Sequence, residues 1–276
     1  MAFALGPKAL AAGYRLVAYE TIGSTSTEAM ASAARGDPGK LWVVSREQTA
    51  GHGRRGQNWQ TPPGNLAASL LRPAAGPASA TIGFAAGLAL ENAIRAVAPS
   101  VAESQYQNPH PLRGRVYQSH HLALKWPNDV LLNGAKIAGI LLEAMTRPGA
   151  QASVVIGIGV NVAHAPKGVP YPVSSLIENG ADISAETLFI ALGESWVEQD
   201  SLWNEGRGFA AIRDRWLERA AGIGAPIAVK IGADVVRGTF ETIDEEGRLI
   251  VRVGDGSSRA ISAGDVHFGA VATAAL

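Results

Sequence analysis

The most informative stretch of this chain is Gln48-Thr49-Ala50-Gly51-His52-Gly53-Arg54-Arg55-Gly56-Gln57-Asn58-Trp59. It lies between two expected strands, 41–47 and 65–71. Glycines allow backbone N–H groups to approach a ligand closely, and arginine presents a planar fork that matches carboxylate or phosphate oxygens. Trp59 adds a flat apolar face that suits an aromatic base or an apolar tail. The stretch fits either a solvated surface loop or a binding site for an anionic ligand.

The composition indicates a folded protein without net charge. Of the 276 residues, 47% are apolar and 17% are charged, which is typical of a globular chain and argues against disorder. Basic and acidic residues number 24 each, so any anion must be recognised by locally placed cations rather than by an overall field. Cysteine is absent, which excludes disulfides, thiolate metal sites and thiol catalysis.

The chain length permits one large domain and one small domain. Residues 1–13 carry no secretory signal, and no apolar run reaches the roughly 18 residues that a membrane span requires. We therefore expect a cytoplasmic protein that makes no membrane contact.

A hydroxyl-rich segment begins the first expected helix. A strand-like run, 14–19, is followed by Gly23-Ser24-Thr25-Ser26-Thr27-Glu28 and then by alanine-rich sequence. Thr25 and Glu28 have the spacing of a capping box. The hydroxyls of Ser24 and Thr25 therefore serve as a helix start, as ligand contacts, or as both.

A second informative stretch is Leu124-Lys125-Trp126-Pro127-Asn128-Asp129-Val130-Leu131-Leu132-Asn133-Gly134-Ala135-Lys136-Ile137-Ala138-Gly139. Asn-Gly between apolar runs is a strong hairpin signal. Strict alternation along the second strand places Lys136 on the same face as Ala138, opposite Gly139. A lysine just after a tight turn is commonly a solvated edge charge. Gly139 offers the alternative, because it leaves room for a ligand beside the strand.

A third apolar run, 153–162, has the unbroken β-branched character of a strand buried on both faces. Gly157 and Gly159 indicate close packing against another group. Asn161 needs polar partners, either from the backbone or from a ligand. Helical patterns are expected to cover the sheet at 79–97, 184–203 and 209–220.

Beyond Gly222 the pattern changes to short alternating strands separated by glycine-containing turns. The expected strands are 226–231, 235–243, 249–253 and 259–261. About fifty residues of this kind predict a small β-barrel. The predicted fold class is α+β, with a mixed β-sheet covered by helices in residues 1–221 and the barrel in residues 222–276.

Residues 99–115 are polar and rich in turn signals, as in an inserted loop, and we assign them no function. His110, His120 and His121 lack the ordered spacing of a metal site. No metal held directly by protein side chains is therefore expected.

Five motifs in one order, followed by a terminal barrel, resemble the catalytic core of the biotin protein ligases. The resemblance runs from about Tyr14 to the C-terminus, and it implies a biotin/lipoate ligase-like domain followed by an SH3-like barrel. The motifs are Gly23-Ser24-Thr25, Gly51-His52-Gly53-Arg54-Arg55-Gly56, Lys125-Trp126-Pro127-Asn128-Asp129, Lys136-Ile137-Ala138-Gly139 and Gly157-Ile158-Gly159-Val160-Asn161.

The resemblance implies an ATP-dependent enzyme, a biotin–[biotin carboxyl-carrier protein] ligase. Such an enzyme activates biotin as biotinyl-5′-AMP and transfers it to one lysine of the biotin carboxyl carrier protein or domain of a carboxylase. ATP and biotin are its substrates, and Mg²⁺ is bound through phosphate. By resemblance, Arg54 and Lys136 are catalytic, because they offset the repulsion between the biotin carboxylate and the α-phosphate.

The resemblance also implies the binding residues. Those expected to contact biotin are Ser24, Thr25, Gln48, Gly51, His52, Gly53, Arg54, Lys136 and Gly139. Those expected to contact ATP are Arg54, Arg55, Trp59, Lys136, Gly157, Gly159 and Asn161. Arg55 either supports phosphate binding or orders the loop, and Asp129 is expected to orient the incoming lysine amine or a hydrated Mg²⁺.

Two positions depart from the family's pattern, which commonly has arginine where His52 and Gln57 stand. With two cations missing from the loop, we expect the adenylate to be made but held less tightly. The segment before the first strand is too short for an N-terminal DNA-binding domain. The expected partners therefore include no nucleic acid, and the expected state is a monomer or a homodimer.

Three other functions compete with this interpretation. A lipoate-type protein ligase shares the fold, but lipoate has no ureido group for Ser24, Thr25 and Gln48 to bind. A non-catalytic protein that binds biotin or its adenylate has no need of Lys136. A single-stranded nucleic-acid binder would use Arg54, Arg55 and Trp59 together with the barrel.

Overall fold

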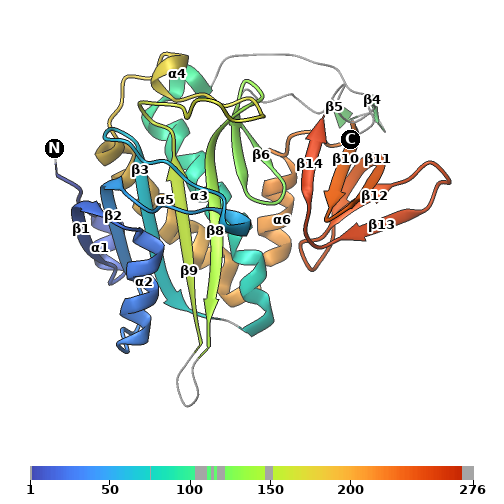
Figure 1. Cartoon of the computed structure of the whole chain (residues 1–276). Helices are drawn as coiled ribbons and strands as arrows, with labels where there is room; N and C mark the ends of the chain where they lie inside the picture. The colour runs from blue at the N-terminus through green and yellow to red at the C-terminus, as the bar shows by residue number, and fades with distance from the viewer. Residues whose placement is uncertain are drawn as a thin grey trace.

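Figure 1 shows a large sheet with helices on both faces and a second, smaller sheet near the C-terminus. The computed structural model describes residues 2–74, 76–102, 111–112, 115–116, 122–146 and 152–268. Within these residues the large sheet has the strand order β1-β2-β3-β9-β8-β7-β6. Its strands are β1 Arg15–Ile22, β2 Leu41–Gln48, β3 Leu66–Pro73, β6 Leu122–Lys125, β7 Asp129–Leu132, β8 Ala135–Met145 and β9 Ser153–Val160. β1 runs parallel to β2, and the other neighbouring pairs are antiparallel.

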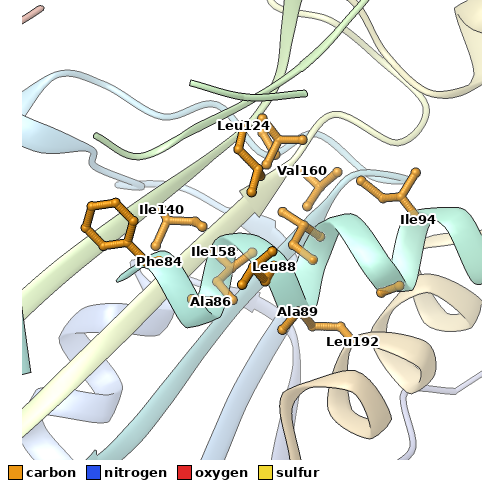
Figure 2. Packing of buried hydrophobic residues seen from close by; sticks show 14 of the residues in the cluster. Phe84, Ala86, Leu88, Ala89, Ile94, Leu124, Ile140, Ile158, Val160 and Leu192 are labelled. Atoms are coloured by element: carbon orange, nitrogen blue, oxygen red, sulfur yellow. The ribbon is translucent and has the colours of Figure 1, made fainter. Parts of the chain in front are cut away.

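The register between β8 and β9 shows which residues lie on each face of the large sheet. Ile140 lies opposite Ile158 in the register, and Gly139 lies opposite Gly159. The isoleucines pack against α3, Ile82–Val97, as Figure 2 shows together with Leu88 of that helix. The expectation of a strand buried on both faces is confirmed, because β9 is buried from its second residue to its end.

Helices cover the sheet unequally. On the face of the isoleucines, α3 packs against α5, Ala185–Trp203, and α6, Phe209–Leu217. The other face carries α2, Thr25–Ala34, which lies against Gly157. The described residues also form two short helices, α1 Pro7–Ala11 and α4 Pro99–Ala102.

The predicted capping box is wrong in its details. The N-cap of α2 is Ser24, whose Oγ accepts a hydrogen bond from the Thr27 N–H at 3.4 Å. Glu28 does not reach back to the cap, because its Oε1 accepts a hydrogen bond from Arg35 at 2.7 Å. Thr25 is the first helical residue, and its hydroxyl is free to serve another element.

The second sheet is antiparallel and has the strand order β13-β12-β11-β10-β14. Its strands are β10 Pro226–Ile231, β11 Asp234–Ile243, β12 Leu249–Arg252, β13 Ser258–Ile261 and β14 Asp265–Phe268. A helix-covered mixed sheet followed by this unit confirms the predicted fold class. The strand β14 was not predicted, although its residues Asp265–Phe268 alternate between polar and apolar. The division between residues 1–221 and 222–276 stays a prediction.

The inserted segment is only partly described. It begins with α4 and contains a short antiparallel pair, β4 Pro111–Leu112 and β5 Arg115–Val116. His110, His120 and His121 lie outside the described residues. Within the part of the chain that the structure describes, no helix combines the length and the apolar character that crossing a membrane requires.

Candidate active site

The glycine–arginine loop, residues 51–59, closes on itself. The Gly53 N–H donates to Gln57 O at 2.7 Å, and the Trp59 N–H donates to Gly51 O at 2.9 Å. Gly51 is required by this closure, because a Cβ there would lie 2.4 Å from Trp59 O. The backbone N–H groups of Gly53 and Trp59 are therefore used within the loop, and it is through side chains that the loop contacts the rest of the molecule.

Arg54 reaches from this loop to the turn that precedes β7. Its Nη1 donates to Asn128 Oδ1 at 3.1 Å. Asn128 is fixed in turn by β8, because its Nδ2 donates to Ile140 O at 2.8 Å. Burial lowers the pKa of Arg54, and the carboxylate of Asp265 opposes this shift. A half-buried guanidinium with a neutral partner keeps its charge available to an anion.

Lys136 reaches the same turn from the start of β8. Its Nζ lies 2.7 Å from Oδ1 of Asp129, the residue after Asn128, and both side chains are less than one-fifth exposed. Asp129 Oδ1 is buried and makes no well-directed hydrogen bond, so this carboxylate can still accept one. The side chains of Arg54 and Lys136 are thus anchored on consecutive residues.

The prediction that Lys136 shares a face with Ala138 is wrong, and a β-bulge is the reason. In the β7–β8 ladder Leu131 pairs with Lys136, whereas the preceding Val130 pairs with Ala138. The extra residue between these pairs shifts the alternation by one position. Lys136 therefore points to the face of Gly139, whose Cβ position lies 3.4 Å from the Lys136 Nζ.

Trp59 lies against the glycine pair at the middle of the sheet. A Cβ on Gly159 would be 2.3 Å from the indole, and a Cβ on Gly139 would be 3.2 Å from it. The Lys136 Nζ is 5.6 Å from the centre of the Trp59 ring. The two glycines are therefore needed for a planar ring to reach the strands beside the lysine.

Tyr171 covers Lys136 as well, and the sequence analysis missed it. Its ring centre lies 5.8 Å from the Lys136 Nζ, and the side chain is about half exposed. Main-chain bonds hold its segment in place: the Lys136 N–H donates to Pro172 O at 2.9 Å, and the Ser174 N–H donates to Lys136 O at 3.1 Å. A tyrosine in a proline- and glycine-rich loop has no periodic signal by which sequence could reveal it.

A buried polar cluster lies where β2 meets the start of α2. Gln48 Oε1 accepts from the Thr25 N–H at 2.8 Å and lies 3.1 Å from the Thr25 hydroxyl, while Gln48 Nε2 donates to Thr61 Oγ1 at 3.0 Å. Thr25 Oγ1 is 2.8 Å from Ser69 Oγ, which is 3.0 Å from Ser26 Oγ. The structure brings Thr25 and Gln48 together as expected and adds Ser26, Thr61 and Ser69, which were not predicted.

His52 and Ser24 flank this cluster differently. The Nε2 of His52 lies 3.3 Å from Oε1 of Glu143, so the loop is linked to β8. The Ser24 hydroxyl accepts the N-cap bond and is nearly buried. Gln57, by contrast, is exposed at the surface of the loop.

Gly157 and Asn161 lie away from the indole. A Cβ on Gly157 would be 2.7 Å from Ser26 Oγ, so this glycine accommodates α2 rather than Trp59. Asn161 is 2% exposed, and its Nδ2 donates to Ser174 O at 3.1 Å. Of the two partners considered for Asn161, the backbone is the one present here, and the segment that carries Tyr171 is fixed by it.

Arg55 contacts the second sheet instead of the Lys136 side. Its Nη1 lies 2.5 Å from Asp265 Oδ2 at the start of β14. Lys125 lies in the same region, with its Nζ 5.6 Å from the ring centre of Phe268, and burial lowers its pKa. Of the two roles expected for Arg55, this contact favours ordering of the loop over phosphate binding.

A cavity of about 350 Å³ adjoins the Arg54 side of this arrangement. Its lining includes Arg54, Phe84, Trp126, Asn128 and Gly247, from both sheets and α3. Lys136 is not part of that lining. Over the described ranges, no group of three or more His, Cys, Asp or Glu side chains is placed to hold a metal ion.

Comparison with known proteins gives concordant matches. Residues 20–161 match the biotin/lipoate A/B protein ligase family, and residues 222–269 match the biotin protein ligase C terminal domain. A biotin--[acetyl-CoA-carboxylase] ligase of Paracoccus denitrificans is 42% identical over 89% of this chain and 97% of its own length. Its counterpart from Mycobacterium tuberculosis is 34% identical over 88% of this chain and 85% of its own length.

A solved structure shares the fold. The biotin protein ligase from Aquifex aeolicus in complex with biotin and ATP superposes with a TM-score of 0.73 at 19% sequence identity. The superposition covers 92% of this chain and 99% of that one.

Proposed function

This chain belongs to the biotin/lipoate A/B protein ligase family, and we propose that it activates biotin with ATP as biotinyl-5′-adenylate and transfers the biotinyl group to a lysine of a biotin carboxyl carrier protein. Two of its relatives are named for acetyl-CoA carboxylase, which supports a carrier from that class of enzyme as the acceptor. The catalytic roles that follow are part of the same proposal.

The first step joins two anions. A carboxylate oxygen of biotin attacks the α-phosphorus of ATP, the bond to the bridging oxygen breaks, and pyrophosphate leaves. Fixed cations lower the repulsion between the reactants and stabilise charge on the phosphoryl oxygens. One observation carries the proposal: Arg54 and Lys136, from distant segments, are anchored on Asn128 and Asp129, which are adjacent in the chain.

The second step, transfer of the biotinyl group to the acceptor lysine, needs no covalent bond between the substrate and the ligase. The amine of the acceptor lysine attacks the acyl carbon, AMP leaves with the electron pair of the broken C–O bond, and the amine loses a proton. Positioning then supplies most of the catalysis. Asp129 is proposed to orient that amine, which is supported by its place beside Lys136, where its side chain is less than one-fifth exposed.

The biotin ring is assigned to the polar cluster of Thr25 and Gln48. A ureido group offers both donors and acceptors, which suits a cluster of hydroxyl and amide groups that can each donate and accept. Gln48 uses both ends of its amide on Thr25 and Thr61, which supports a role in orienting Thr25. Ser24 and the loop residues Gly51, His52 and Gly53 border this region in our assignment.

The nucleotide is assigned to the side of the glycine face covered by Trp59 and Tyr171. Both rings lie within 6 Å of the Lys136 ammonium, as stacking partners of a base beside a phosphate require. Gly139 and Gly159 let a planar group approach the strands. The nucleotide is also assigned to Arg55, Gly157 and Asn161, with less direct support. Within the protein these three residues contact Asp265, Ser26 and Ser174, respectively.

Mg²⁺ is expected to accompany ATP, bound through phosphate and water. The described side chains form no site of their own for it: Asp129, the carboxylate beside Lys136, is already in an ion pair. We assign no step to the metal.

The test is to mix the protein with ATP, Mg²⁺ and biotin, and to measure pyrophosphate release and the mass of the adenylate. A carrier domain is then added and its mass followed. We expect adenylate formation with biotin, and transfer to one lysine. Lys136→Ala and Arg54→Ala should each lose at least about a hundredfold in rate while remaining folded. Lys8→Ala, on exposed α1, is the matched control and should behave as wild type.

The principal rival is a lipoate ligase. The same assay with lipoate in place of biotin separates the two functions, and adenylation of lipoate in preference to biotin would refute the assignment of the Thr25–Gln48 cluster. Tight binding of biotin without pyrophosphate release would instead identify a non-catalytic binder. Retention of single-stranded oligonucleotide in a salt-dependent manner would favour the nucleic-acid alternative.

A further inference from the structure

We infer that Asp265, in the second sheet, is a positioning residue for the glycine–arginine loop, acting through its ion pair with Arg55. The inference rests on the proposed function and assigns a task to the C-terminal sheet. It is carried by a contact between residues far apart in the sequence, at the tip of the loop that also holds Arg54.

The first observation is where the carboxylate comes from. Asp265 is the first residue of β14 and pairs with Lys230 of β10, so its backbone is held by the second sheet. Its Oδ2 lies 2.5 Å from Arg55 Nη1, and both side chains are about half exposed. A strand of the second sheet thus offers an anchor to the exposed tip of the loop.

The second observation is the backbone of Arg55. Its φ of 56° and ψ of 28° lie in the left-handed region, which residues other than glycine, asparagine and aspartate rarely adopt. Gly56 follows with a φ of 71°. Glycine would adopt this backbone conformation at a lower energetic cost than arginine. The ion pair with Asp265 is the side-chain contact that offsets this cost at position 55.

The third observation is the balance of charge. Arg54, Arg55, Lys125 and Lys136 lie on this side of the molecule, and the carboxylates that influence them are those of Asp129 and Asp265. Asp265 offsets part of the repulsion between the neighbouring guanidiniums of Arg54 and Arg55. Holding Arg55 on the second sheet therefore leaves Arg54 directed to Asn128.

The consequence is that removing the Asp265 charge should loosen the loop over the bound adenylate. In Asp265→Asn we expect biotinyl-adenylate to dissociate about two- to fivefold faster, the loss expected of one half-exposed ion pair. The KM for biotin should rise by a similar factor, while kcat at saturating substrate stays within about 1.5-fold of wild type. Trypsin should cleave after Arg54 or Arg55 faster in the variant, as detected by mass spectrometry of the fragments.

A control and a rescue make the test specific. Glu241→Gln removes the acidic partner of Arg252 within the same sheet and should change neither adenylate release nor cleavage of the loop. The exchange Arg55→Asp with Asp265→Arg re-creates the pair in reverse and should recover at least half of the lost adenylate lifetime. Thermal unfolding of each variant shows whether the second sheet remains folded.

The outcomes separate this inference from the proposed function. If wild type makes no biotinyl-adenylate, the proposed function fails. If wild type makes it and a folded Asp265→Asn retains it equally long, the inference is overturned. An effect of Asp265→Asn that adds in full to that of Arg55→Ala would also overturn it, because residues acting through one contact are not additive.

Discussion

Alternate residues of β8 and β9 form the two faces of this strand pair, and the two faces differ in the size of their side chains. On one face, Ile140 and Ile158 lie opposite each other and fill the space below α3 (Figure 2). On the other face, Gly139 and Gly159 lie opposite each other and leave the backbone bare, so that the Trp59 ring reaches it. The packed face fixes the position of the strands, and the bare face uses that fixed backbone as a wall for planar groups.

The largest effect is expected on the packed face. Ile158 is 3% exposed, and Ile158→Ala should lower the free energy of unfolding by about 2–5 kcal/mol, because it removes buried methyl groups and leaves a cavity. Denaturant titration measures this loss, and Ile158→Val, expected to cost about 0.5–1.5 kcal/mol, is the graded control. At temperatures where Ile158→Ala is folded, adenylate formation should be near normal. Abolished adenylation in the folded variant would show that the two faces are not separable.

The bare face should respond in activity rather than in stability. Gly159→Ala places a Cβ 2.3 Å from the present position of the Trp59 ring, so the ring must move and the affinity for ATP should fall by about tenfold. Gly254→Ala, in open space in the second sheet, is the control. Wild-type affinity in Gly159→Ala would mean that the glycine is not needed for the ligand side of the sheet.

A smaller effect is expected from changes in the loop residues His52 and Gln57, of which the first contacts β8 on the bare face. His52 lies beside Glu143, whereas Gln57 is exposed. His52→Arg should therefore tighten biotinyl-adenylate binding several-fold by a charge-assisted link between the loop and β8, and Gln57→Arg should change it by less than twofold. Equilibrium binding of the adenylate to both single variants and to the double variant decides the matter. An unchanged dissociation constant in the double variant would contradict our expectation that the missing arginines weaken binding.

The smallest effect lies outside both faces. Burial, with the nearby Lys125, lowers the pKa of His267 below its usual 6.5. Above pH 6.5 both folded and unfolded chains carry neutral His267, so it contributes nothing to the pH dependence. As pH falls below 6.5 the unfolded chain is protonated first, and stability is lost down to the folded-state pKa. The melting temperature of wild type should thus drop more between pH 7.5 and 5.5 than that of His267→Gln. Equal drops would remove His267 as the cause.

Much of this arrangement could be predicted from local patterns. The Asn133-Gly134 turn, with φ of 53° and 79°, and the run of β9 both appear where the sequence placed them. Residues such as Thr25 and Gln48 were placed in one site by resemblance, and the structure brings them into contact. Two short elements were not predicted: the five residues of α1, which are too few to show a helical period, and β14, whose four residues alternate between polar and apolar.

The features that escaped prediction are set by contacts between separate segments rather than by the pattern within one segment. The bulge before Ala138 depends on how β7 meets β8, so alternation within β8 alone gave the wrong face for Lys136. Tyr171 is recognisable only from its place beside Lys136. The link between Arg55 and Asp265 joins two exposed charges that carry no pattern at all.

The position of β9 has a consequence for the order in which the site assembles. β9 is the last strand of the large sheet in the sequence, but it lies between β3 and β8. Until β9 pairs with both of them, the sheet does not hold the loop after β2 near Lys136 at the start of β8. The contacts that complete the sheet are therefore distant in sequence, which is the kind that forms slowly. A nascent chain that has not yet added its ninth strand possesses both cations but no place where they meet.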